Sequence, residues 1–275
     1  MATEILAGPL GEIQRASTAD GGTALSTTAA FIQFPLGTQW VSITPRNFSS
    51  PTAVVKWLLN PWLFVLKTAD LLATRPTDYS EAAQDNNTAT DVDLSSLDTL
   101  ANRDMVLIGS HVPFAGLYVD VDGTNSNASV SSFFYWNGVI WVDTGATDGT
   151  MPVGTTLAQD GSVTWTVPTP WQTANLADIT PFAGYTLAAE EFPGKREKLY
   201  WIRWTVGAAL DSTTTLDSIS SINRSTNYSE WMAGQVFESM LATGPGEWGC
   251  IQALTSAGTA NLIVNVAGRR GGKFR

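Results

Sequence analysis

One stretch of the chain constrains its fold more than any other. Residues 132–143 read SFFYWNGVIWVD and place an Asn-Gly pair between two runs of aromatic and β-branched side chains. Asn-Gly readily adopts the positive φ angles of a two-residue type I′ turn, and the flanking residues favour extended backbone. The stretch therefore predicts a β-hairpin closed by Asn137 and Gly138.

Both faces of this predicted hairpin are apolar near the turn. A two-residue loop makes four cross-strand pairs: Trp136 with Val139, Tyr135 with Ile140, Phe134 with Trp141 and Phe133 with Val142. One face can fill a sandwich core, and the other then needs cover from a neighbouring strand, a second domain, a partner chain or a ligand. The simplest arrangement is a strand pair buried on both sides within one protein. If the second face is open instead, its candidates for an interface or for stacking on a sugar are Phe134, Tyr135, Trp136 and Trp141.

Alternation of apolar and polar residues extends the β prediction to most of the chain. In LYVDVD (117–122), Leu117, Val119 and Val121 share one face of a strand. Similar runs occur at 30–45, 52–59, 162–167, 199–206, 213–220 and 260–266. Only 15% of the residues are charged, which is few for a protein with long surface helices. We therefore expect an all-β fold built on an antiparallel, jelly-roll-like β-sandwich.

The domain organisation follows from where this signal is strong. Residues 105–222 are expected to form the sandwich. Residues 77–104 contain seven acidic side chains and one basic one, which predicts a polar linker or a long solvated loop. Residues 223–267 are too few to hold a core alone, so we expect them to pair with the N-terminal β segment, 1–76. The sandwich would then be inserted in a second, smaller β domain, and the alternative is that it follows such a domain in tandem.

The charge distribution argues against nucleic acid and anionic membranes as partners. The formal net charge is −10, although the last eight residues, 268–275, are basic. An acidic body repels phosphate groups, so only this segment could contact them. Its basic residues are Arg269, Arg270, Lys273 and Arg275. They form either an arm that docks on an acidic neighbour or a disordered end.

No segment predicts a membrane span or secretion. The most apolar stretch, 54–66, is interrupted by Lys56, Asn60 and Pro61 and is too short to cross a bilayer. The N-terminal residues lack the basic and apolar regions of a signal peptide. The single cysteine, Cys250, excludes an internal disulfide framework and a cysteine-based zinc cluster. We expect synthesis in a reducing cytosol.

Residues 118–127, YVDVDGTNSN, suggest a calcium site at first sight. Counted from Asp120, however, the residues at the positions that an EF-hand requires are wrong, including the glycine at position 6 and the glutamate at position 12. A looser site at a strand end is still open, because Asp120 and Asp122 share a face while Asn125 and Asn127 could close over an ion. A structural calcium ion is thus the one cofactor that the sequence suggests.

Catalytic motifs are missing from the sequence. The only histidine is His111, and no Gly-x-Ser-x-Gly elbow is present for it to serve. No glycine-rich loop precedes a helix in the way that phosphate binding requires. The sequence predicts a protein that is not an enzyme.

Three segments carry a resemblance to a known class of proteins. They are LYVDVDGTNSNASVSSFFYWNGVIWVD, TLAQDGSVTWTVPTPW and KLYWIRWTVGAALDSTTTLDSI. Over roughly residues 115–222 the chain resembles a β-sandwich module of structural proteins in tailed bacteriophage virions. The resemblance implies a virion component made in the bacterial cytoplasm and present in symmetric copies, with other virion proteins and copies of itself as partners. Tail, neck or baseplate protein and capsid-surface protein are equally compatible with it.

A function of a different class is also compatible with these residues. A carbohydrate-binding or receptor-recognition module presents aromatic side chains on a sheet face, where they stack against sugar rings. Tyr135, Trp136 and Trp141 are the first candidates, and the ligand would be a glycan of the host surface. This alternative predicts that Trp141→Ala retains the fold and loses glycan binding.

Overall fold

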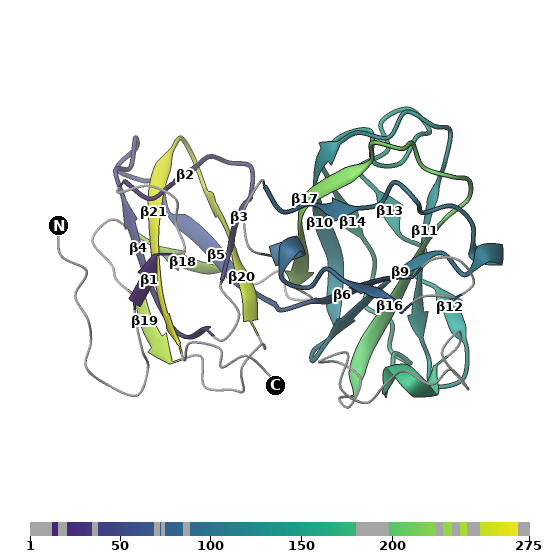
Figure 1. The fold of residues 1–275 in the computed structure, drawn as a ribbon. Coiled ribbons are helices and arrows are strands. Elements are labelled where there is room, and N and C mark those ends of the chain that lie inside the picture. The colour runs from purple at the N-terminus through teal and green to yellow at the C-terminus, as the bar shows by residue number, and fades with distance from the viewer. Residues whose placement is uncertain are drawn as a thin grey trace. The chain divides into compact units, whose positions relative to one another are not determined.

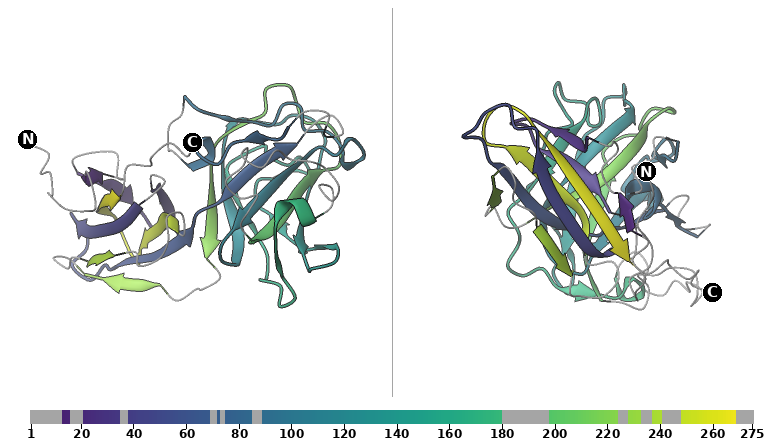
Figure 2. Two further views of the ribbon diagram at one scale, coloured as in Figure 1. Left: turned by 60° about the horizontal axis from the view of Figure 1, so that its bottom comes forward. Right: turned by 90° about the vertical axis from the view of Figure 1, so that its left-hand side faces the viewer.

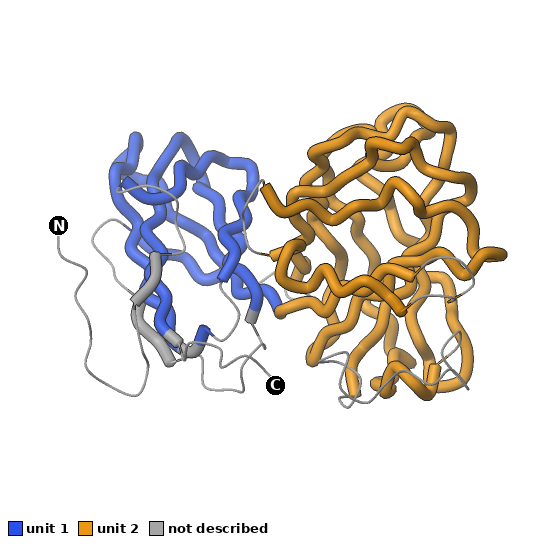
Figure 3. The backbone as a smooth tube through the Cα atoms, in the orientation of Figure 1, with its two compact units in different colours: residues 1–61, 225–275 blue, residues 62–224 orange. Residues whose placement is uncertain are grey.

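The computed structural model describes residues 13–15, 21–34, 38–68, 72, 75–84, 89–179, 198–223, 228–232, 237–240 and 248–268. These residues form β-strands joined by turns and short 3-10 helices, which confirms the all-β prediction. The chain divides into two compact units (Figure 3), unit 1 with residues 1–61 and 225–275 and unit 2 with residues 62–224. Within the described residues, no helix has the length and apolar character needed to cross a membrane.

Unit 2 is a sandwich of two antiparallel sheets (Figure 1). One sheet has the order β13-β14-β10-β17-β8. Its strands are β8 (Val92–Asp93), β10 (Phe114–Gly123), β13 (Thr147–Asp148), β14 (Gly161–Thr164) and β17 (Thr215–Asn223). The other sheet has the order β12-β11-β16-β9-β6-β7, and β15 also pairs with β16. Its strands are β6 (Phe64–Thr68), β7 (Thr77–Asp78), β9 (Met105–Ser110), β11 (Ser131–Trp136), β12 (Trp141–Asp143), β15 (Thr173–Ala174) and β16 (Leu199–Val206).

Eight of these strands have the pairing of a jelly roll. Counted along the chain without the short β13 and β15, they run from β8 to β17. The first pairs with the eighth, the second with the seventh, the third with the sixth and the fourth with the fifth: β8 with β17, β9 with β16, β10 with β14, and β11 with β12. A long hairpin rolled up on itself produces this order. The predicted jelly-roll-like sandwich is therefore confirmed.

The core of unit 2 lies between its two sheets and is rich in tryptophan. Leu117 and Val119 of β10 point into it, as the alternation predicts, and Val121 packs at its edge. Four buried indole rings of unit 2 have their N–H groups satisfied: Trp165 by Phe114 O, Trp171 by Trp201 O, Trp201 by Ala174 O and Trp204 by Ser131 Oγ. A buried indole needs such a partner. These tryptophans therefore serve packing rather than an exposed binding surface.

The segment predicted to be a linker is part of this sandwich, so the prediction for 77–104 is wrong. Leu94 and Leu97 are fully buried in the core, and the buried Gln84 amide bonds both the N–H and the carbonyl of Leu63. The acidic composition wrongly predicted a linker, because acidic side chains in this segment stabilise turns of the folded sandwich. For example, Asp93 Oδ1 accepts the N–H of Ser95. The boundary expected at residue 76 is likewise wrong, since unit 2 begins at Trp62.

Unit 1 is a smaller sandwich made from both ends of the chain. One sheet has the order β1-β21-β4-β19 with β2 also on β21, and the other has the order β18-β5-β20-β3. The strands of the first are β1 (Ile13–Arg15), β2 (Thr23–Leu25), β4 (Thr38–Arg46), β19 (Phe237–Met240) and β21 (Ala260–Gly268). Those of the second are β3 (Ala30–Gln33), β5 (Val55–Pro61), β18 (Ser229–Trp231) and β20 (Trp248–Thr255). Figure 2 shows the long strands β4 and β21 side by side, and side chains from both sheets form one apolar cluster.

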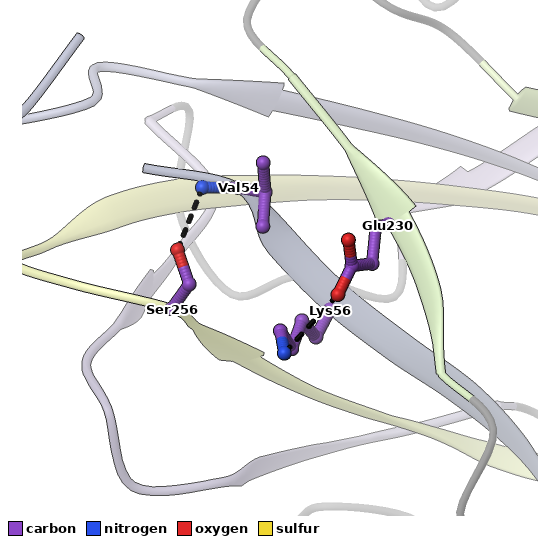
Figure 4. A network of polar contacts seen from close by, with 4 residues as sticks. All are labelled: Val54, Lys56, Glu230 and Ser256. Carbon is purple, nitrogen blue, oxygen red and sulfur yellow. Dashed lines mark hydrogen bonds and ion pairs between the residues drawn. The ribbon is translucent and has the colours of Figure 1, made fainter. Parts of the chain in front are cut away.

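Polar contacts add to the strand pairing in unit 1 (Figure 4). Lys56 of β5 forms an ion pair with Glu230 of β18 at 3.1 Å, and the N–H of Val54 donates to Ser256 Oγ at 3.0 Å. The side chains of Lys56 and Glu230 are 35% and 56% exposed, so their ion pair contributes about 0.5 kcal/mol to stability. The free energy of folding in this unit therefore comes mainly from its apolar core.

Candidate functional site

The hairpin in the jelly roll has a longer loop than its sequence predicts. Trp136 pairs with Trp141, Tyr135 with Val142 and Phe134 with Asp143, so the predicted register is wrong by two residues. The loop spans residues 137–140, because Asn137 Oδ1 accepts the N–H groups of Val139 and Ile140 at 2.9 and 2.8 Å. Only Gly138, with φ of 98°, has a positive φ in this loop. The asparagine side chain thus replaces the type I′ geometry with an Asx turn.

A shift of two residues leaves each side chain on its predicted face. Phe133 and Tyr135 point into the core between the sheets, and Tyr135 is only 7% exposed. Phe134, Trp136 and Trp141 share the outer face. Tyr135 is therefore unavailable for an interface or for sugar stacking, contrary to its place among the candidates.

Part of the outer face is covered by the chain itself. Trp136 is 6% exposed and belongs to a second apolar cluster that includes Leu176, Ile179 and the fully buried Trp201. The N–H of Gln172 also donates to the carbonyl of Trp136 at 3.0 Å. Segment 171–179 of the same chain therefore covers this part of the outer face. Trp136 is thus a packing residue, and only Phe134 and Trp141 remain partly accessible.

Next to these two side chains lies a half-buried arginine. Arg203 of β16 pairs with Phe134 of β11, and its Cζ lies 4.5 Å from the ring centroid of Phe134 and 5.2 Å from that of Trp141. Burial lowers the pKa of its guanidinium to about 10, so it is charged at neutral pH. Among the residues that the structure describes, no carboxylate forms an ion pair with Arg203, and its buried Nε has no hydrogen-bond acceptor.

Sequence reasoning missed Arg203 although one signal for it was present. The segment LYWIRWTV (199–206) is otherwise uncharged, so its single charge on a strand was unusual. The alternation places Arg203 on the face opposite Ile202 and Trp204, which are both in the core. What the pattern could not indicate is that the neighbouring strands supply aromatic rings rather than carboxylates.

The tip of the hairpin also differs from the prediction, because the predicted register placed Val139 and Ile140 in the second strand. Val139 and Ile140 are 78% and 58% exposed because they lie in the loop and not in β12. Two adjacent exposed apolar side chains at a hairpin turn are available for contact with another protein. The hairpin therefore offers an apolar tip and, on its outer face, an arginine between aromatic rings.

The predicted calcium residues lie on a different surface, the outer face of the other sheet. Asp120 and Asp122 are close to Asp160 and Asp217, and burial together with repulsion from these carboxylates raises the pKa of Asp120. The Asn125 amide does not close over them, because its oxygen already accepts the N–H groups of Asn127 and Asp211. In the described ranges no three acidic, histidine or cysteine side chains lie close enough to hold a metal ion. The arrangement is a repulsive acidic face.

His111 and Cys250 both have packing contacts. The ring of His111 meets the ring of Phe64 edge-on, with centroids 5.8 Å apart. Cys250 is buried in unit 1, where its sulfur accepts a hydrogen bond from Asn60 Nδ2 at 3.6 Å. Both contacts serve packing. The predicted docking residues Arg269, Arg270, Lys273 and Arg275 lie outside the described residues.

Comparisons with protein-family models, with curated proteins and with solved structures found no match to this chain.

Proposed function

We propose that this protein is a non-enzymatic structural component of a tailed-phage virion and acts through contacts between subunits. The observation that carries the proposal is the jelly-roll strand order of unit 2, because this sandwich recurs in viral capsid proteins. A fold alone does not determine a function, since jelly rolls also form lectin domains and cupins. The resemblance of residues 115–222 to phage structural modules adds support for the virion.

The exposed hairpin tip supports a role in subunit contacts. Val139 and Ile140 are adjacent and are largely exposed. The fully buried core of an interface is more apolar than its rim and is depleted in charged residues. Copies of the same chain and other virion proteins are the proposed partners, and tail, neck, baseplate and capsid surface are the compatible positions.

Sedimentation velocity over a range of protein concentrations tests this role. We expect the wild type to self-associate and Val139→Ser/Ile140→Ser to raise the dissociation constant roughly tenfold or more, since two apolar side chains leave the interface. The matched control is Val153→Ser, because Val153 is 89% exposed but lies in another loop. A wild type that stays monomeric at every concentration contradicts the proposal. Equal association by the double variant excludes the tip as the contact.

The C-terminal basic residues are proposed as a docking arm for the same assembly. Deletion of residues 268–275 removes four positive charges. We expect the shortened protein to fold normally and to enter virus particles less efficiently, because an acidic neighbour loses its partner. Incorporation at the wild-type level shows that these residues do not anchor the protein.

A further inference from the structure

The environment of Arg203 is unusual for a structural arginine. A guanidinium carries five N–H donors, and arginines withdrawn from water normally pair with a carboxylate or with backbone carbonyls. Arg203 is half-buried, and its Nε is shielded from water without an acceptor. The rings of Phe134 and Trp141 lie beside its guanidinium. These rings stabilise the cation, but they cannot accept its hydrogen bonds in the plane of the guanidinium.

The surrounding sheet holds this arginine in place. Arg203 lies in β16 between β11 and β9, paired with Phe134 on one side and Leu107 on the other. Leu107 is fully buried, and Trp201, two residues earlier on the same face, is fully buried as well. The guanidinium is thus presented from a rigid central strand. A preorganised donor set of this kind loses little entropy when it binds an anion.

We propose that the outer face formed by Phe134, Trp141 and Arg203 binds an acidic saccharide, with Arg203 pairing with the carboxylate of the sugar. The carboxylate supplies two in-plane acceptors for the Nη groups of the guanidinium, because Nε is shielded from solvent. The C–H face of the sugar ring packs against the accessible parts of the two aromatic side chains. Binding at this face is independent of the assembly role proposed above, because the apolar tip at Val139 and Ile140 takes no part in it.

The chemistry of the three side chains favours this ligand over related ones. A neutral sugar can pack on the rings but leaves the positive charge without a counterion. Inorganic phosphate can pair with Arg203 but makes no use of the adjacent rings. An acidic sugar satisfies both, so we expect it to bind more tightly than a neutral sugar of the same length.

Isothermal titration calorimetry with a tetrasaccharide of glucuronic acid tests the proposal, with a glucose tetrasaccharide as the neutral probe. We expect the acidic probe to bind the wild type and the neutral one to bind at least roughly tenfold more weakly, since a charge-assisted pair is lost. Arg203→Gln should lower the affinity for the acidic probe by a similar factor. Arg203→Lys should also lower it, because lysine keeps the charge but not the planar fork.

Lys198→Gln provides a control matched in charge. Lys198 is exposed and lies directly before β16, so this variant loses one positive charge without touching the site. We expect it to bind the acidic probe as the wild type does. Circular dichroism and the melting temperature establish that each variant is folded. Arg203→Lys keeps the test valid if Arg203→Gln does not fold.

Three results overturn the proposal. The first is that neither tetrasaccharide binds the wild type. The second is that inorganic phosphate or an acidic peptide binds at Arg203 while the saccharides do not, which identifies an anion site of another class. The third is that Arg203→Gln folds and binds the acidic probe as tightly as the wild type does.

Discussion

The indole N–H of Trp204 donates a 2.8 Å hydrogen bond to the hydroxyl of Ser131. This hydroxyl also bonds Thr156 Oγ1 at 2.7 Å, and Thr156 in turn donates to Asp148 Oδ2 at 2.7 Å. Trp204 and Ser131 belong to one sheet of the jelly roll, and Asp148 belongs to the other. A polar chain at the edge of the core therefore connects the two sheets of unit 2.

Replacement of Ser131 by alanine should destabilise unit 2. The variant leaves the buried indole N–H of Trp204 without an acceptor, which costs about 2 kcal/mol. Urea unfolding followed by tryptophan fluorescence measures the change. Ser132→Ala is the matched control, because Ser132 is also half-buried but makes no such contact, and its effect should stay within about 0.5 kcal/mol. Equal effects of the two variants contradict a special role for Ser131.

Asn125→Ala should be more damaging than its position in a polar loop suggests. The buried amide of Asn125 donates to the carbonyls of Asn127 and Thr156 and accepts the N–H groups of Asn127 and Asp211. Losing these bonds should lower the free energy of unfolding by about 3 kcal/mol. Asn127→Ala, which removes one long bond to Ala209 O, should cost less than about 1 kcal/mol. A mild effect of Asn125→Ala would show that water replaces the amide.

Asp120→Asn should stabilise the protein at neutral pH. The folded pKa of Asp120 is raised above its ordinary value of 3.8 by burial and by the carboxylates of Asp160, Asp217 and Asp122. The folded state therefore holds this proton more tightly than the unfolded state, and its stability falls as the pH rises through the raised pKa. Asparagine does not titrate, so the gain of about 0.5 kcal/mol should be present at pH 7 and disappear below pH 3.8.

Melting temperatures at pH 7 and pH 3.5 measure this difference, and Asp178→Asn on another surface is the control. The same experiment with calcium tests the metal hypothesis. If calcium raises the melting temperature of the wild type but not that of Asp120→Asn, the acidic face is a calcium site and the repulsive description is wrong.

Gly109→Ala should destabilise the covered part of the outer sheet face. A Cβ on Gly109 would lie 2.6 Å from Cζ3 of Trp201, whose ring is fully buried. The ring has no room to move, so the variant should cost about 2 kcal/mol in unfolding free energy. Gly207→Ala is the control, because the nearest atom to its Cβ is 3.7 Å away. If chemical denaturation gives the same stability for both variants, Trp201 is less tightly held than described.

The all-β fold and the faces of the main strands could be predicted from local pattern. In β10 the alternation of Leu117, Val119 and Val121 suffices, because a strand with one buried face must repeat every two residues. The core tryptophans follow the same rule, with Trp165 and Trp204 both on a predicted apolar face. The alternation within one strand is enough to predict its buried face, because that face does not depend on which strands pair with it.

Other features depend on contacts that no short segment contains. The hairpin register changed because the Asn137 side chain bonds the backbone of its own loop, which dipeptide preference does not reveal. Residues 77–104 were judged by their acidic composition, whereas a few leucines determine their packing. Arg203 could not be identified from its own segment, because the aromatic ring beside it, that of Phe134, comes from the neighbouring strand β11.

The central claim is that the protein is a structural part of a virion, and quantitative mass spectrometry of purified phage particles tests it most directly. A structural subunit that acts through symmetric contacts should be recovered from intact particles in a fixed number of copies that matches a ring or shell symmetry. That number should not change after a high-salt wash that strips adsorbed host proteins. Absence of the protein from intact particles, or a variable amount that the wash removes, contradicts the account.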